Sequence, residues 1–177
     1  ATGQNPHFER AINPINPQLA LGGSSSGSAA AVAAGLSYFS LGTDTAGSVR
    51  IPAATCGILG LKTTHGLIDT TGCAPLSPSL DSIGILARHV EDARLALQIL
   101  APRPAASRSS KPLRHRFWLP ESGLSASVRS ILGEWSQALH AAPCDLTQII
   151  STSSIHAQRV LCHEVAQTHR AALLQQT

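Results

Sequence analysis

The sequence has no methionine, only 3% aromatic residues and only 13% charged residues. Its core must therefore be built from Leu, Ile, Val and Ala, and the many small residues let backbone segments approach closely. A hydrophobic content of 43% over 177 residues is enough for one domain with a buried core. Because the net charge is only +3 and few aromatic rings are available for base stacking, the composition argues against a nucleic-acid partner.

Cysteine pairs of the C-x-x-C type and long apolar runs are also absent from the sequence. The four cysteines are therefore interpreted as reduced thiols of a cytoplasmic protein. The longest weakly polar run, residues 28–41, is interrupted by Gly and Ser and is too short to cross a bilayer. The eight histidines are dispersed, so we expect no metal site, and no organic cofactor is implied.

A glycine- and serine-rich stretch invites a phosphate-binding interpretation. Gly22 and Gly27 have the G-x-x-x-x-G spacing of a loop whose N–H groups hold an anion. However, Ser28 stands where the lysine of that motif should follow. Nucleotide hydrolysis is therefore not expected.

Alternating helix and strand patterns predict a layered α/β fold with a parallel or mixed sheet. We expect a short helix over 28–34 that ends at Gly35, and a buried strand over 36–43. A helix over 89–100 would place four apolar residues on one face: Val90, Ala93, Leu97 and Leu100.

A polar linker is predicted at about 102–112, and an extension follows over 113–177. In this extension we expect short strands at 117–119 and 146–150, and a final helix from about Ser154. Between the strands, the i, i+3, i+4, i+7, i+11 spacing predicts a helix with the apolar stripe Val128, Ile131, Leu132, Trp135 and Leu139.

The loop in "LGTDTAGSVRIPAA" presents Ser48 as a candidate nucleophile. A serine hydroxyl needs a partner that removes its proton, and the oxyanion formed on attack needs N–H donors already in place. The small residues Thr45, Ala46 and Gly47 can supply such donors. On spacing alone, Ser48 could equally be the cap of a helix that begins at Val49.

The stretches "GGSSSGSAAAVAAG" and "LGTDTAGSVRIPAATCGILGLKTTHG" together resemble the amidase signature family. The resemblance is densest over about 19–100 and extends over nearly all of 1–177, which we interpret as a partial amidase signature domain. It implies a layered α/β/α fold around a central mixed sheet, incomplete in this chain. We expect the chain to be the central part of a longer amidase, or a degenerate copy of one.

The resemblance implies a catalytic triad of two serines and a lysine. Ser48 matches the nucleophile, and Ser24, which lies 24 residues earlier, matches the serine that follows a cis peptide bond and relays the proton. The catalytic lysine is absent, because Lys62 matches a structural lysine and Lys111 lies in the polar linker.

The resemblance also assigns the residues around the nucleophile. The backbone of Thr45, Ala46 and Gly47 matches the oxyanion hole, together with the N–H of Ser48 itself. Ala46 replaces a more usual glycine, which requires a negative φ there. Asp44 and Arg50 are interpreted as structural residues of the loop, and Asp81 likewise.

The function implied is hydrolysis of the C–N bond of a small-molecule carboxamide through an acyl-enzyme, with release of ammonia or an amine. The isolated chain should be inactive without the lysine. The sequence is compatible with a homodimer. Two alternatives within the family are the glutaminase subunit of a tRNA-dependent amidotransferase and an allophanate hydrolase-like enzyme. Outside enzymology, the alternative is a pseudoenzyme or gene fragment kept, if at all, for association.

Overall fold

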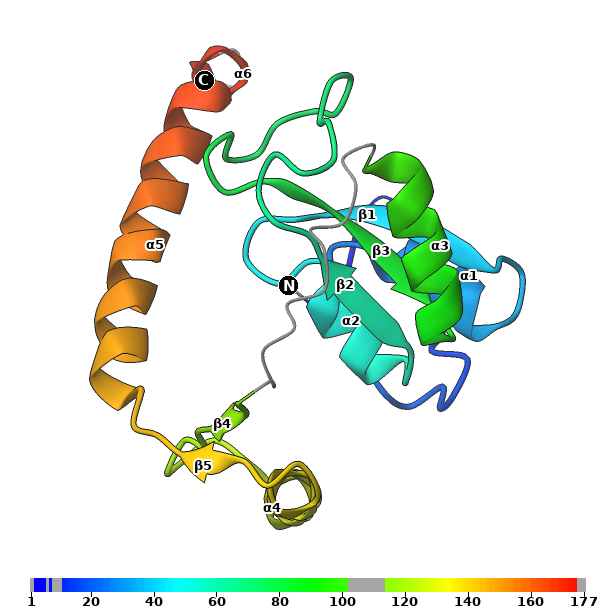
Figure 1. The fold of residues 1–177 in the computed structure, drawn as a ribbon. Helices are drawn as coiled ribbons and strands as arrows, with labels where there is room; N and C mark the ends of the chain where they lie inside the picture. Colours follow the sequence, from blue (N-terminus) through cyan, green and yellow to red (C-terminus); the bar gives the residue numbers. More distant parts are fainter. Residues whose placement is uncertain (1, 6, 8–10, 102–113, 175–177) are drawn as a thin grey trace. The chain divides into compact units, whose positions relative to one another are not determined.

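The computed structural model describes residues 2–5, 7, 11–101 and 114–174 (Figure 1). Two compact units emerge from its internal contacts. The larger unit comprises Ala1–Ala106 and His163–Thr177, and the smaller comprises Ser107–Cys162. The predicted linker at about 102–112 lies outside the described residues.

A three-stranded antiparallel sheet forms the centre of the larger unit. Its strands are β1 (Phe39–Asp44), β2 (Leu59–Lys62) and β3 (Ser82–Ala87), in the order β1-β3-β2. All six residues of β3 are buried, as expected for the central strand of a covered sheet. The register pairs Gly42 with Gly84, and Gly84 with Lys62.

Glycines line one face of this sheet, and two helices pack against it. These helices are α1 (Ser26–Ala33) and α2 (Arg50–Thr55), whose Ala29, Val32 and Ala53 form a buried cluster with Leu86. A Cβ added at Gly84 would lie 2.9 Å from a side-chain carbon of Val49, and one added at Gly60 would lie 2.6 Å from the Cβ of Ala53. The small residues anticipated from composition therefore bring the start of α2, and with it the Ser48 loop, close to the sheet.

The opposite face of the sheet is aliphatic and is covered by α3 (Val90–Leu100). Ile83, Ile85 and Ala87 alternate along β3 and pack with Ala93 and Ala96. The predicted α3 face is confirmed for Ala93, Leu97 and Leu100, whereas Val90, at the first turn, is 61% exposed. The larger unit thus has three layers, helix on sheet on helix, and the predicted layered α/β class is confirmed. The described strands of its sheet are antiparallel, whereas a parallel or mixed sheet was expected.

The sequence located the first helix and strand correctly and misplaced their ends. α1 begins two residues before the predicted start, and Gly35 follows its C-terminus with a φ of +77°. β1 begins at Phe39 rather than at Leu36, which is exposed. The predicted burial of this strand is wrong, because Asp44 is the only buried residue of β1, an edge strand of the described sheet.

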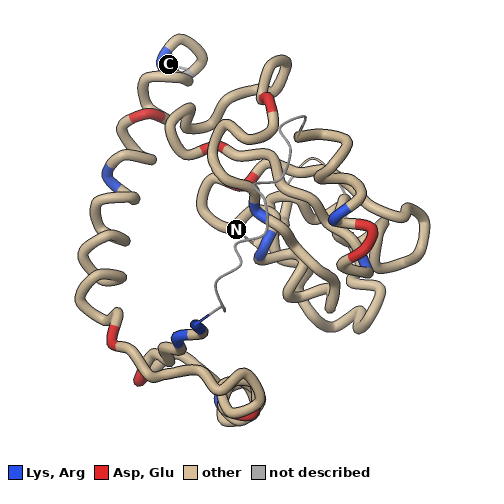
Figure 2. The backbone as a smooth tube through the Cα atoms, viewed as in Figure 1, with Lys and Arg blue, Asp and Glu red and all other residues tan. Residues whose placement is uncertain are grey.

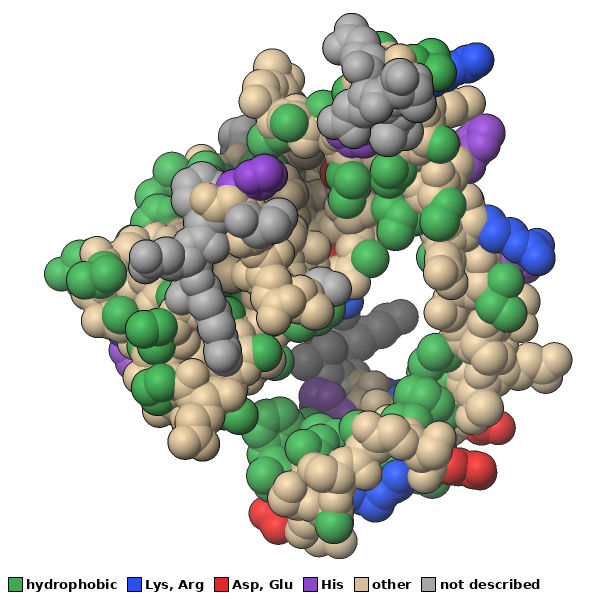
Figure 3. Space-filling view, turned by 180° about the vertical axis from the view of Figure 1, so that it is seen from behind, with side chains coloured by type: hydrophobic (Ala, Val, Ile, Leu, Met, Phe, Trp, Pro, Cys, Tyr) green, Lys and Arg blue, Asp and Glu red, His purple; other side chains and the backbone are tan. Residues whose placement is uncertain are grey.

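The smaller unit contains β4 (Arg116–Phe117) and β5 (Ala142–Pro143), which pair in parallel, and α4 (Ala126–Ala138). Ser125 caps α4, because its hydroxyl accepts the N–H of Val128. Four residues of the predicted stripe lie on α4 and Leu139 is its C-cap, but Ile131 and Trp135 are 49% and 61% exposed. In Figure 3, hydrophobic side chains accordingly reach the surface of the molecule.

One predicted strand is wrong. Four of its five residues, 147–150, form the start of a long helix, α5 (Thr147–Thr168), which is followed by α6 (Arg170–Leu174). The final helical region therefore begins at Thr147 rather than at about Ser154. The Asp145 carboxylate accepts the N–H of Thr147 at 2.9 Å and satisfies a free donor of the first turn. A short apolar run such as "LTQII" fits a strand and a helix equally well, and this cap favours the helix.

Candidate active site

The candidate nucleophile lies on the loop between β1 and α2. β1 ends at Asp44, α2 begins at Arg50, and Ser48 is half-buried between them. Gly47 has a φ of +113°, a conformation that favours glycine. Among the described residues only His140 is a non-glycine with positive φ, so Ala46 has the negative φ that an alanine at this place in the motif requires.

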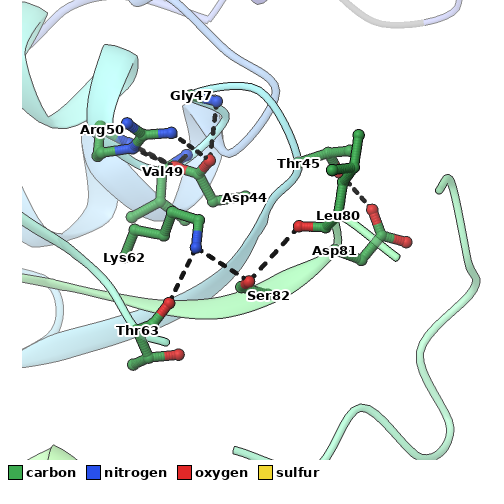
Figure 4. Close-up of polar contacts among 10 residues, drawn as sticks. All are labelled: Asp44, Thr45, Gly47, Val49, Arg50, Lys62, Thr63, Leu80, Asp81 and Ser82. Carbon is green, nitrogen blue, oxygen red and sulfur yellow. Dashed lines mark hydrogen bonds and ion pairs between the residues drawn. The ribbon is translucent and has the colours of Figure 1, made fainter. Parts of the chain in front are cut away.

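Asp44 holds this loop from within (Figure 4). Its buried carboxylate accepts the N–H groups of Gly47 at 2.8 Å, Val49 at 3.2 Å and Arg50 at 3.3 Å. The Arg50 guanidinium adds two contacts, from Nε at 3.0 Å and from Nη2 at 2.9 Å. Five donors therefore converge on one side chain, and together they determine the path of the loop.

The electrostatics of this pair follow from the same contacts. Burial raises the pKa of Asp44, but the hydrogen bonds from Arg50 and from the N–H groups of Gly47, Val49 and Arg50 outweigh it and lower the pKa from 3.8 to about 2. The hydrogen bond to Asp44 in turn raises the pKa of Arg50. Asp44 is thus a carboxylate throughout the neutral and mildly acidic range.

The segment that contains Ser24 lies against the Ser48 loop. The N–H of Ser25 donates to the carbonyl oxygen of Ser48 at 3.1 Å, and the peptide bond between Gly23 and Ser24 is cis. Ser26 donates its hydroxyl to the carbonyl of Gly22 at 2.6 Å. The structure therefore brings the two predicted serine segments together, with Ser24 exposed and Ser48 half-buried.

Asp81 contacts the loop from outside, which the sequence did not predict. One of its oxygens, Oδ1, accepts the hydroxyl of Thr45 at 2.5 Å (Figure 4). Oδ2 accepts the N–H groups of Leu76 at 2.8 Å and Ser77 at 3.0 Å. The sequence indicated a structural role for Asp81, but 36 residues separate it from Thr45 and no local pattern links the two.

Lys62 is half-buried and has polar partners of its own. Its Nζ donates to the carbonyl oxygen of Thr63 at 3.0 Å and to the hydroxyl of Ser82 at 3.1 Å (Figure 4). Lys111 lies outside the described residues. Within the described residues, the hydrogen bonds of the Lys62 ammonium therefore go to Thr63 and Ser82 and not to Ser24 or Ser48.

Other kinds of site find little support in the described residues. No three His, Cys, Asp or Glu side chains within them gather closely enough to hold a metal ion, and none of their helices is long and apolar enough to span a membrane. Figure 2 shows that Lys, Arg, Asp and Glu are sparse along most of the chain trace. The loop around Ser48 is the candidate site because Asp44 orders it and the segment with Ser24 lies against it.

The chain belongs to the amidase family, whose model matches residues 1–131. The A subunit of the glutamyl-tRNA(Gln) amidotransferase from Staphylococcus aureus (strain MRSA252) is 44% identical over 110 residues, which is 62% of this chain and 23% of that protein. A crystal structure of an amidase is 35% identical with a TM-score of 0.84, over 98% of this chain and 41% of the amidase.

A third comparison shows likeness of fold alone. The allophanate hydrolase of Kluyveromyces lactis is 23% identical and has a TM-score of 0.80, over 99% of this chain and 32% of the hydrolase. The chain therefore spans less than half the length of each of these proteins.

Proposed function

We propose that this chain carries the nucleophile and the oxyanion-binding loop of an amidase that cleaves the C–N bond of a small-molecule carboxamide. The observation that supports this most is the hydrogen bond from the N–H of Ser25 to the carbonyl of Ser48 at 3.1 Å. It holds the segment with Ser24 against the Ser48 loop in a chain of the amidase family.

In the proposed reaction, Ser48 Oγ attacks the carbonyl carbon, its proton passes to the oxygen of Ser24, and Ser24 gives its own hydroxyl proton to a base. The C–N bond then breaks, and ammonia or an amine leaves with the proton that the same relay returns. Water attacks the resulting acyl-enzyme, which releases the acid and restores the Ser48 hydroxyl.

The oxyanion requires N–H donors that are not already engaged. Gly47, one of the three residues predicted for this task, donates its N–H to Asp44 at 2.8 Å and so shapes the loop. We therefore assign the oxyanion to the N–H groups of Thr45 and Ala46, supported by that of Ser48. Asp44 and Arg50 act on the backbone of the loop in this proposal.

The base is the missing part. Lys62 is engaged by Thr63 and Ser82, so we propose that a lysine supplied in addition to these 177 residues activates Ser24. The 177-residue chain alone should then show no carboxamide turnover. Turnover by the chain alone that disappears in Ser48→Ala would contradict this part of the proposal.

A second candidate is a glutaminase that releases ammonia for a partner protein. It is favoured by the 44% identity to the A subunit of an amidotransferase. In a protein that contains this segment and the activating lysine, a glutaminase would prefer glutamine to simple aliphatic amides, whereas a general amidase would turn over both.

The free cysteines among the described residues suit a cytoplasmic location, which we also propose.

Covalent labelling tests the identity of the nucleophile. In a protein that contains both this segment and the activating lysine, a fluorophosphonate should modify Ser48, and mass spectrometry of the peptide should locate the adduct. Ser48→Ala should abolish labelling, and Ser40→Ala, a half-buried serine of β1, should leave it unchanged. Labelling that survives Ser48→Ala would mean that the nucleophile is elsewhere, and no labelling of any variant would favour a non-catalytic protein.

A further inference from the structure

A carboxylate near the end of α5 contacts the loop that precedes β3. Glu164 accepts the hydroxyl of Ser77 at 2.6 Å and the N–H of Ser79 at 3.1 Å. Ser77 is fully buried, so its hydroxyl depends on this one carboxylate rather than on water. The hydrogen bond from Ser77, followed by those from Ser79, lowers the pKa of Glu164. Both segments belong to the larger unit.

Ser77 is also the centre of its own loop. Its carbonyl oxygen accepts the N–H groups of Leu80 at 2.9 Å and Asp81 at 2.8 Å, while its own N–H donates to Asp81 Oδ2 at 3.0 Å. Ser77 and Asp81 are thus joined in both directions. A displacement of Ser77 must therefore displace the Asp81 carboxylate.

Asp81 transmits this position to the catalytic loop. Its Oδ2 accepts hydrogen bonds from the N–H groups of Leu76 and Ser77, and its Oδ1 accepts one from the hydroxyl of Thr45. Thr45 directly precedes Ala46, one of the proposed oxyanion donors. The loop is consequently held by Asp44 from within and by Asp81 from outside.

We propose that Glu164 is a positioning residue for the Ser48 loop and acts through Ser77, Asp81 and Thr45. Its catalytic meaning rests on the proposed function, whereas the mechanical coupling from Glu164 to Thr45 does not. The consequence is that a residue 116 positions after Ser48 in the sequence helps to fix the donors that would bind the oxyanion.

Hydrogen–deuterium exchange on the 177-residue chain tests the coupling. The amides to follow are those of Gly47 and Val49, both bonded to Asp44, and that of Ser77, bonded to Asp81. Glu164→Ala should speed exchange at all three by about tenfold or more, because a charge-assisted hydrogen bond to a buried group is lost. Glu164→Gln, which keeps one acceptor oxygen, should restore part of the protection. Gln167→Ala, at an exposed position on the same helix, is the matched control and should change nothing.

A double variant identifies the route. Thr45→Val removes the hydroxyl that reaches Asp81, so it should speed exchange at Gly47 and leave Ser77 protected. In the Thr45→Val background, Glu164→Ala should no longer affect Gly47. The proposal is overturned if Glu164→Ala changes Ser77 alone, if its effect on Gly47 persists unchanged in the Thr45→Val background, or if the Gly47 amide of the unaltered chain exchanges as fast as a free amide.

Activity separates this inference from the proposed function. In a protein that contains the activating lysine, Glu164→Ala should lower kcat by up to about 100-fold with KM nearly unchanged, and Glu164→Gln should recover part of the loss. If Ser48 is labelled but the exchange coupling is absent, the inference fails and the function stands. If the coupling is present but Ser48 is not labelled, the proposed function fails and the contact is structural only.

Discussion

The convergence of five donors on Asp44 makes Asp44→Asn the most informative single change in the loop. An amide has one acceptor oxygen, and its NH2 group must face donors at the position of the other carboxylate oxygen. In one orientation the NH2 meets Gly47 and Arg50 Nη2, and in the other it meets Val49, the N–H of Arg50 and Arg50 Nε. At least two hydrogen bonds are lost in either case.

The size of the destabilisation depends on which of the released donors can form hydrogen bonds to water instead. The Arg50 side chain is 53% exposed, so its guanidinium is rehydrated at little cost. The buried N–H groups have no such partner, and each one left unpaired costs about 1–3 kcal/mol. With the lost charge, Asp44→Asn should lower the free energy of unfolding of the larger unit by about 3 kcal/mol.

The pH dependence provides a second signature. The pKa of Asp44 is about 2 in the folded protein against its ordinary 3.8. Because the folded-state pKa is the lower one, the stabilisation is fully present above pH 3.8 and is lost as the pH falls towards 2. The two values correspond to about 2 kcal/mol that the unaltered chain should lose over this range and Asp44→Asn should not.

Amide exchange in β3 is the suitable assay. All six residues of β3 are buried, so their exchange, corrected for the intrinsic rate at each pH, reports opening of the larger unit. Tryptophan fluorescence would not serve, because Trp118 and Trp135 both lie in the smaller unit. Asp69→Asn, at an exposed carboxylate, is the control. The reasoning would be refuted if the protection of the β3 amides in Asp44→Asn lay within threefold of that in the unaltered chain near neutral pH. It would also be refuted if the protection fell with acid in the same way in both proteins.

Two further predictions concern packing and thiol reactivity. Gly84→Ala would place a Cβ 2.9 Å from the carbonyl oxygen of Leu61 and should destabilise the larger unit by about 1–3 kcal/mol. Gly27→Ala, in α1 with no heavy atom within 4 Å of the new Cβ, should stabilise the larger unit by about 0.5–1 kcal/mol. Both free energies of unfolding can be measured in urea from amide exchange in β3. If the two substitutions changed the free energy of unfolding in the same direction, the packing argument would be contradicted. Burial raises the pKa of the Cys56 thiol, so a thiol reagent should modify the exposed Cys73 and Cys162 first and reach Cys56 only on unfolding. Equal rates at Cys56 and Cys73 in the native chain would argue against this buried position.

The sequence alone predicted most of the local structure of the larger unit. The Gly- and Ser-rich stretch, the Ser48 loop and the apolar periodicity of α3 are all local patterns, and the structure has α1, the loop and α3 in those places. The strand expected at 146–150 is wrong because a run of five residues fits the two-residue period of a strand and the 3.6-residue period of a helix. In the structure the N–H of Thr147 donates to Asp145 and residues 147–150 are helical.

For the candidate site, the sequence determined which residue types are present and their spacing, from Asp44 to Arg50 and back to Ser24. Only the tertiary structure decided which distant carboxylate satisfies which donor. The hydroxyl of Thr45 donates to Asp81, 36 residues away in the sequence, and the hydroxyl of Ser77 donates to Glu164, 87 residues away. The physical reason is that a local pattern constrains only the backbone it belongs to, whereas a buried hydroxyl must take its partner from whatever segment the packed sheet and helices bring beside it.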